Sequence, residues 1–201
     1  MQPGPDRQPR AGGREREHPW DSEESCRVLS QQGSGEGGGV VYCICEGGLY
    51  TIRVRARAGC GPLMPGDRLA LPTEDGESEE IATILGGARY RDMPAGAQAV
   101  ITDVVHDLIR DLPDKFLAFY NRAGNLSRKY HAFQLLPGIG PSKAREMVEG
   151  RGRLGWDTFE DVDESCNIDS AQLLTDRLVE ELKDPQMTPS LLENVVRIPD
   201  A

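Results

Sequence analysis

The first clear pattern along the chain is an alternation of apolar and polar residues, which predicts β-strands. In segment 50–57, three apolar residues alternate with Arg53, Arg55 and Arg57, so one face of this strand is apolar and the other basic. Shorter apolar runs at 40–45, 68–71 and 81–85 predict three more strands, separated by Gly and Pro turns. Such strands predict a small OB-like β-barrel over residues 39–93. The arginine row could follow a nucleic-acid backbone, or it could be an ordinary solvated face.

Helical periodicity replaces this alternation from Pro94 onward. Apolar residues recur every three or four positions as far as residue 109, which predicts an amphipathic helix, and Pro113 begins a second one. We expect Ser127 to cap a third helix, and similar patterns predict helices near 158–162 and 171–183. The buried side of the third helix would consist of Tyr130, Phe133, Leu135 and Leu136. The fold class is therefore α+β, a barrel followed by an α-helical domain over residues 94–184.

The two ends of the chain lack these patterns. Residues 1–38 contain four prolines, many charges and few aliphatic residues, so we predict a disordered segment in which Trp20 is a candidate docking point. Residues 185–201 form a C-terminal tail. Within it, the apolar segment 195–198 is predicted to be a strand that returns to the barrel.

One stretch indicates a specific chemistry, Leu135-Leu136-Pro137-Gly138-Ile139-Gly140-Pro141-Ser142-Lys143-Ala144. Its two glycines allow positive φ and leave their N–H groups uncovered. Because Pro141 suits the first position of a helix, the turn would present free amides at a helix N-terminus, where the macrodipole favours an anion. Lys143 adds a positive charge. The pattern is typical of a helix-hairpin-helix module that holds a nucleic-acid phosphate, and the alternative is a turn used only for packing or protein contact.

A second, weaker copy of this helix–turn–helix pattern follows the first. Segment 166–170 takes the place of the glycine turn, but it contains no glycine, and Asp163, Glu164 and Asp169 lie nearby. Both features disfavour a phosphate. We therefore predict that this second half is structural and packs against the first.

The distribution of charge favours a nucleic-acid partner although the total does not. The chain carries 23 basic and 33 acidic residues, a net charge of −10. Segment 122–153 nevertheless holds seven bases against two acids, a local charge of +5, and the glycine turn lies inside it. The candidate nucleic-acid-binding residues are Arg128, Lys129, Gly138, Ile139, Gly140, Ser142, Lys143 and Arg145. The acidic remainder of the chain is a candidate surface for a protein partner.

Metal, cofactor and membrane functions are not predicted. The five cysteines lack zinc-ribbon spacing and are expected to be reduced thiols; a zinc site would have to combine Cys26, Cys43, Cys45 and Cys60. No segment is long and apolar enough to span a bilayer, and the N-terminus lacks a secretory apolar region. We expect a cytoplasmic protein without a cofactor.

Catalysis is not predicted either. Helix-hairpin-helix glycosylases with lyase activity use a similar turn, but they place a nucleophilic lysine one position earlier, where this chain has Ser142. Glu160 and Asp161 lie on a short predicted helix without an evident partner. The three histidines have no metal-ligand spacing.

The order of several motifs adds a resemblance to a known family. The motifs are Arg89-Tyr90, two helices, Leu126-Ser127-Arg128-Lys129-Tyr130-His131, the glycine turn and Phe159-Glu160-Asp161. This order resembles an archaeal family known as domain of unknown function 655, and the resemblance covers residues 48 to 183. It implies an OB-like barrel ahead of a helix-hairpin-helix unit and RNA binding without an established reaction. It also implies that Gly138, Gly140 and Lys143 contact phosphate, with Lys129 and His131 as neighbours.

The sequence therefore predicts a non-catalytic nucleic-acid-binding protein, with RNA preferred over DNA. It would grip the phosphate backbone through the glycine turn, a contact that positions the ligand without reading its bases. The alternative is a protein-interaction adaptor in a ribosome- or polymerase-associated complex. A DNA-repair enzyme is the least favoured of the three hypotheses.

Overall fold

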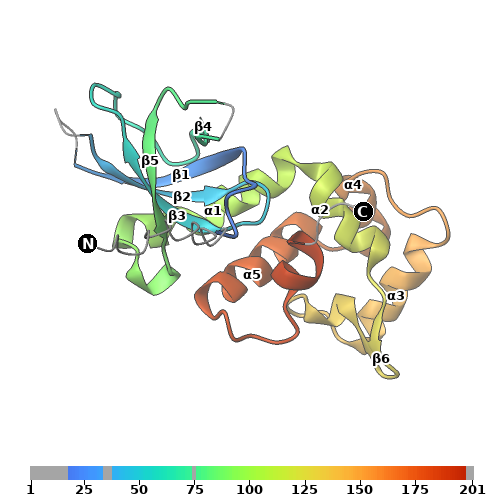
Figure 1. Cartoon of the computed structure of the whole chain (residues 1–201). Coiled ribbons are helices and arrows are strands. Elements are labelled where there is room, and N and C mark those ends of the chain that lie inside the picture. The colour runs from blue at the N-terminus through green and yellow to red at the C-terminus, as the bar shows by residue number, and fades with distance from the viewer. Residues whose placement is uncertain (1–17, 34–37, 74–75, 198–201) are drawn as a thin grey trace, which may run out of the picture.

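Five antiparallel strands form a curled sheet in the N-terminal half of the chain (Figure 1). The computed structural model describes residues 18–33, 38–73 and 76–197. The strands are β1 (Ser25–Gln32), β2 (Val40–Cys45), β3 (Thr51–Ala56), β4 (Arg68–Ala70) and β5 (Ile81–Gly87), in the spatial order β4-β1-β2-β3-β5. The sheet is barrel-like, with β4 and β5 at its edges, so the predicted barrel is confirmed in outline.

The alternation along β3 sets the two faces of this sheet. Ile52, Val54 and Ala56 are buried on the inner face, and the arginines between them are exposed on the outer face. Arg57, the last of the row, donates to the carbonyl of Ser78 at 2.7 Å and pairs with Glu77 at 3.0 Å. It therefore holds the segment before β5 in place, which leaves Arg53 and Arg55 as the exposed members.

The prediction of disorder over residues 1–38 is wrong for its last part. β1 pairs with both β2 and β4, so it lies inside the sheet. Polar residues surround its two aliphatic residues, Val28 and Leu29, which is why its sequence gives a weak strand signal; both are fully buried by neighbouring elements. Trp20 is half-buried against the apolar interior of the sheet rather than free for docking. The predictions for residues 1–17 and 34–37 lie outside the described residues.

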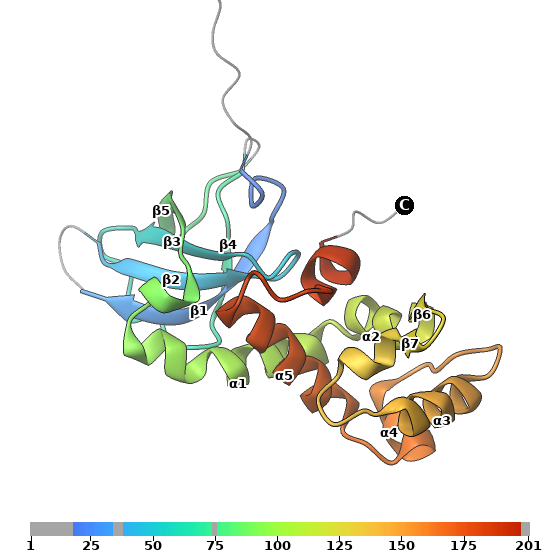
Figure 2. The same cartoon turned by 90° about the horizontal axis from the view of Figure 1, so that it is seen from below.

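Helices make up most of the C-terminal half, and α1 lies across the outer face of the sheet (Figure 2). The helices are α1 (Ala95–Asp111), α2 (Pro113–Arg122), α3 (Pro141–Arg151), α4 (Phe159–Cys166) and α5 (Ser170–Lys183), with a 3-10 turn η1 (Tyr90–Asp92) before α1. Leu29 and Ile44 from the sheet join Ile101 and Leu108 of α1 in one apolar core. This core continues into the remaining helices, so the helical region is packed onto the sheet.

The segment between α2 and α3 differs from the prediction. It forms a hairpin of β6 (Asn125–Ser127) and β7 (Tyr130–His131), then a 3-10 helix η2 (Ala132–Leu135). The helical segment begins later than predicted because its cap lies at His131. His131 Nδ1 accepts from the amide of Phe133, and the Gln134 side chain accepts from the amide of His131. Because the helical start is fixed at His131, Ser127 caps no helix and Tyr130 stays on the surface.

The predicted strand at the C-terminus is also wrong. Leu192–Val196 form a short π-helix, η3, and Ile198 lies outside the described residues. The tail nevertheless returns to the sheet through one side chain. Arg197 Nε donates to the carbonyl of Gly48 at 2.9 Å, and its guanidinium lies 4.2 Å from the ring centre of Tyr50.

Three thiols lie in the interior of the curled sheet. Cys26, Cys43 and Cys45 are free and fully buried, as predicted. A hydrogen bond with Cys26 and burial raise the pKa of Cys43, and burial raises the pKa of Cys45, so both thiols stay protonated. Among the described residues, no three His, Cys, Asp or Glu side chains are grouped to hold a metal ion. None of the described helices is long and apolar enough to cross a membrane.

Candidate nucleic-acid interface

The glycine turn is a β-turn that leads directly into α3. The amide of Ile139 donates to the carbonyl of Leu136 at 3.2 Å and closes the turn around Pro137 and Gly138. Gly138 has φ +75°, the value that a type II turn requires at this position and that glycine adopts without strain. The side chain of Ile139 is buried in the helical core, so it anchors the turn and offers a ligand only its backbone.

The N-terminus of α3 is open to an anion. Its N-cap residue, Gly140, has no side chain to satisfy the first amides, and Pro141 has no N–H. The first helical hydrogen bond runs from the amide of Ala144 to the carbonyl of Gly140 at 2.9 Å, which leaves the amides of Ser142 and Lys143 without a helical acceptor. A Cβ at Gly138 or Gly140 would meet nothing within 4 Å, so the space around the turn is open.

The two glycines have different roles, which corrects the expectation of positive φ at both. Gly138 needs its positive φ, whereas Gly140 is extended, with φ −85° and ψ 178°, a conformation open to any residue. Gly140 contributes by lacking a side chain that would cap the helix. This difference makes Gly140 a position where the interface can be changed without straining the backbone.

The segment predicted as a weaker second copy of the turn is capped by its own side chains. Thr158 Oγ1 accepts from the amide of Asp161 at 3.1 Å at the start of α4, and Asp169 Oδ1 accepts from Gln172 at 3.0 Å at the start of α5. Asn167, with φ 49°, takes the place of a glycine in the turn between them. Because these helices are capped by their own side chains, their N-termini do not present the open amides of α3.

The predicted basic contacts fall into two groups at opposite ends of η2. At the α3 end, Lys143 Nζ lies 3.1 Å from Glu146 Oε2, and Ser142 and Arg145 are exposed. At the other end, Arg128 and Lys129 form the exposed tip of the β6–β7 hairpin rather than part of a helix. The hairpin tip is therefore a second, separate cationic element beside the turn.

Two residues of the basic segment have structural roles instead. Arg151 Nη1 donates to the carbonyls of Tyr120, Asn121 and Ala123, at 3.1, 3.3 and 2.6 Å, and so caps the C-terminus of α2. Burial, followed by the nearby charge of Arg151, lowers the pKa of His131. A neutral His131 fits its function as a hydrogen-bond acceptor at the start of η2.

The two carboxylates considered for catalysis also have partners. Asp161 Oδ2 accepts from the amide of Thr158 at 2.9 Å and completes the cap of α4. Glu160 Oε1 lies 3.4 Å from Arg110 Nη2 on α1. Asp161 therefore caps α4, and Glu160 joins α4 to α1.

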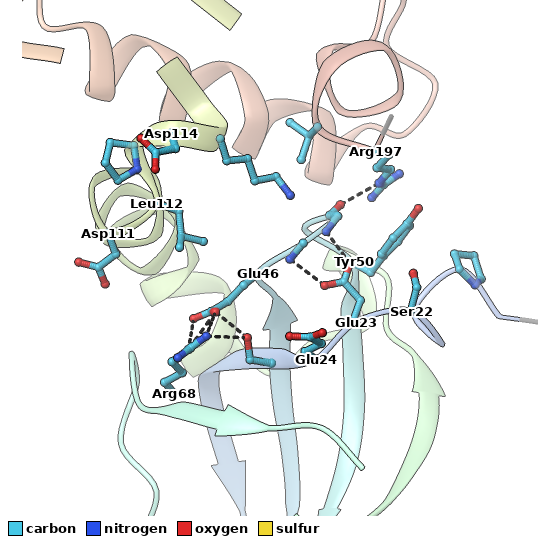
Figure 3. A pocket seen from close by; sticks show the side chains of 17 residues that line it. Ser22, Glu23, Glu24, Glu46, Tyr50, Arg68, Asp111, Leu112, Asp114 and Arg197 are labelled. Carbon is cyan, nitrogen blue, oxygen red and sulfur yellow. Dashed lines mark hydrogen bonds and ion pairs between the residues drawn. The ribbon is translucent and has the colours of Figure 1, made fainter. Parts of the chain in front are cut away.

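A separate hollow of about 640 Å³ lies where the sheet meets the α1–α2 junction (Figure 3). Its two buried carboxylates are already occupied: Glu23 accepts from the amides of Gly47 and Gly48, and Glu46 accepts from Ser25, Arg27 and Arg68. A Cβ at Gly47 would lie 2.5 Å from the Glu23 carboxylate, so a side chain there would displace this carboxylate. These carboxylates stabilise the junction of β1, β2 and β4.

Glu46 gives this junction a predicted pH dependence. Burial alone would raise the pKa of Glu46, but the hydrogen bonds from Ser25, Arg27 and Arg68 outweigh it and lower the pKa. The stabilisation is therefore fully present above the unfolded-state pKa of about 4.3 and is lost as pH falls through the lower folded-state value. We expect Glu46→Gln to lower the free energy of unfolding by about 1.5–3 kcal/mol at pH 7.

Urea unfolding of the wild type and Glu46→Gln, measured from pH 7 down to pH 3, checks this expectation. The difference between the two proteins should shrink as the pH falls below about 4.3. A difference that stays constant over the whole range would mean that ionised Glu46 does not stabilise the junction.

The fold and the turn together define a class, namely small α+β proteins with a curled antiparallel sheet joined to a helical region that carries a glycine turn. The chain belongs to the family described as protein of unknown function (DUF655), whose model matches residues 38–191. The crystal structure of Af1531 from Archaeoglobus fulgidus, from the same family, has a similar fold with a TM-score of 0.76. That likeness covers 85% of this chain and 99% of Af1531 at 23% identity.

A relative from Methanocaldococcus jannaschii, the uncharacterized protein MJ0038, matches a shorter stretch. It is 22% identical over 109 residues, which are 54% of this chain. The match spans 50% of the relative's own length. These similarities establish the family and the fold.

Proposed function

We propose that this protein is a non-catalytic nucleic-acid-binding protein that holds a backbone phosphate at the glycine turn. The observation that carries the proposal is the uncapped N-terminus of α3, where open amides, the helix dipole and Lys143 lie together in a segment of charge +5. In this proposal, η2, the turn and α3 form a helix-hairpin-helix unit whose first helix is one 3-10 turn. The curled sheet is an OB-like barrel, five-stranded and partly open.

The arrangement favours a polymer of phosphates over an isolated anion. The turn can contact one phosphate, while the hairpin tip with Arg128 and Lys129 offers a second cationic contact at the other end of η2. Arg53 and Arg55 on the sheet are a third exposed pair. Phosphate contacts of this kind bind without sequence preference, and we propose RNA as the preferred partner.

Lys143→Glu is expected to abolish binding of a short single-stranded RNA and of its DNA counterpart. The substitution replaces the cation beside the open amides with an anion, and it reverses the attraction to phosphate. Fluorescence polarisation titrations at several salt concentrations measure the effect. The wild type should lose affinity steeply as salt rises, because each neutralised phosphate contributes about −0.7 to the slope of log K against log salt.

Lys183→Glu is the matched control for this experiment. Like Lys143, Lys183 on α5 is paired with a glutamate three residues away, and the substitution changes the net charge by the same amount. It should leave the affinity within about twofold. Equal affinities of the Lys143→Glu variant and the wild type would contradict the proposed site.

A further inference from the structure

An apolar groove of about 650 Å³ lies beside the glycine turn, and the phosphate contacts leave it unused. Its walls come from α2, the β6–β7 hairpin, η2 and the C-terminal segment around η3, which lie next to one another (Figure 2). Phe119, Leu126, Leu135 and Val195 give these walls their apolar character. Leu126, on the β6–β7 hairpin, is 48% exposed and adds an apolar side chain at the lip of the groove.

The groove must lie close to the glycine turn, because residues that are near each other in the sequence belong to both. Leu135 lines the groove and Gly138 follows three residues later, so their Cα atoms are at most about 11 Å apart. Arg122 lines the groove itself, together with one acidic residue, Asp114, and Leu126 precedes the cationic hairpin tip by two residues. Basic side chains near the turn and at the hairpin tip therefore flank the apolar groove.

We propose that this groove takes an unstacked base of a single-stranded nucleic acid whose backbone phosphate is held at the turn, an inference that rests on the proposed function. A base offers a flat apolar face next to an anionic phosphate, and the groove offers apolar walls next to cations. An apolar peptide would match the walls but not the flanking charge. Because a duplex keeps its bases stacked and paired, the groove selects single strands.

The test compares a short single-stranded oligouridine with a sugar–phosphate strand of the same length that lacks bases. The wild type should bind the oligouridine at least about 5-fold more tightly, the lower end of the range for a base stacked on an aromatic ring, because Phe119 is only 2% exposed. Two variants block the groove. Ala118→Trp fills it from α2, and Leu126→Asp places a charge at its exposed lip.

Both variants should reduce the preference for the strand with bases to about one while keeping the salt-dependent binding that Lys143 provides. Leu154→Asp is the matched control, since Leu154 directly follows the basic segment and is fully exposed but does not line the groove. This variant should keep the wild-type preference. If Ala118→Trp fails to fold, Leu126→Asp at its exposed position carries the test alone.

Each other outcome overturns the inference in a recognisable way. A wild-type preference near one, or a preference that both groove variants retain, would exclude a base in the groove while the Lys143 effect still supports the phosphate site. A change in the oligomeric state of free Leu126→Asp, measured by sedimentation, would assign the groove to a second copy of the chain. Failure of the wild type to bind either strand would reject the proposed function itself.

Discussion

Replacing Gly140 by Asp is expected to weaken nucleic-acid binding about 100-fold or more at low salt. The new carboxylate would stand at the N-cap of α3, where it accepts the amides that a phosphate would otherwise use. It would also repel the phosphate: two like charges about 4 Å apart cost on the order of 4 kcal/mol near a protein surface, and about 1.4 kcal/mol corresponds to tenfold in affinity. Polarisation titrations with the same oligonucleotide measure the loss.

The same substitution should leave the fold intact or stabilise it slightly. Gly140 is extended and a Cβ there meets nothing within 4 Å, so no strain is added, and a capping anion at the helix N-terminus contributes about 0.5 kcal/mol. Gly140→Ala is the control, because it adds a side chain without a cap or a charge and should bind within a few-fold of the wild type. Binding by Gly140→Asp at wild-type affinity would show that the α3 N-terminus is not the phosphate site.

Glu181→Ala is expected to destabilise the protein by about 3–5 kcal/mol, because it removes one partner of a buried ion pair. The Glu181 side chain is 2% exposed and pairs with Arg177 Nε at 2.7 Å. It also accepts from Ser190 Oγ at 2.7 Å and from the amides of Leu191 and Leu192 at 2.8 and 3.0 Å. This one carboxylate therefore fixes the segment that leads into η3. That segment, in turn, forms a wall of the apolar groove.

Chemical unfolding measures this loss, and hydrogen exchange of residues 190–197 locates it. The amides of that segment should exchange faster in Glu181→Ala, since two of them lose their acceptor. Glu180→Ala is the control: Glu180 is exposed, and its one ion pair among the described residues is with Lys183, so its loss should change stability by less than about 1 kcal/mol. A Glu181 variant as stable as the Glu180 variant would contradict this assignment.

The sequence predicts those parts of the fold in which a local pattern agrees with the final packing. The alternation in β3 and the apolar stripe of α1 both appear in the structure with the expected faces buried. β1 was not predicted, because the neighbouring strands β2 and β4 supply its hydrogen-bond ladder and its apolar contacts, whereas its own composition gives little strand signal. The helix expected after Ser127 does not form there, because the helical segment η2 begins only after His131. The side chains of His131 and Gln134 cap it, and this pair resembles no common capping sequence.

In the candidate site, too, features set by local sequence were predictable, and features set by contacts between distant segments were not. The glycine turn and the start of α3 were predictable, because proline and glycine constrain the backbone locally. The role of Arg151 was not, since it binds carbonyls of α2 about thirty residues earlier in the chain. The apolar groove was missed for a similar reason: Phe119 and Val195 meet only after the C-terminal segment packs on α2.

If the amides at the start of α3 bind a backbone phosphate, they should respond when a short single-stranded RNA is titrated into the protein and amide NMR spectra are recorded. We expect the largest concentration-dependent shifts on Gly138, Gly140, Ser142 and Lys143, and we expect them to disappear in the Gly140→Asp variant. Binding that leaves these amides unshifted, with the largest changes instead on β3 around Arg53 and Arg55, would show that the phosphate is held elsewhere.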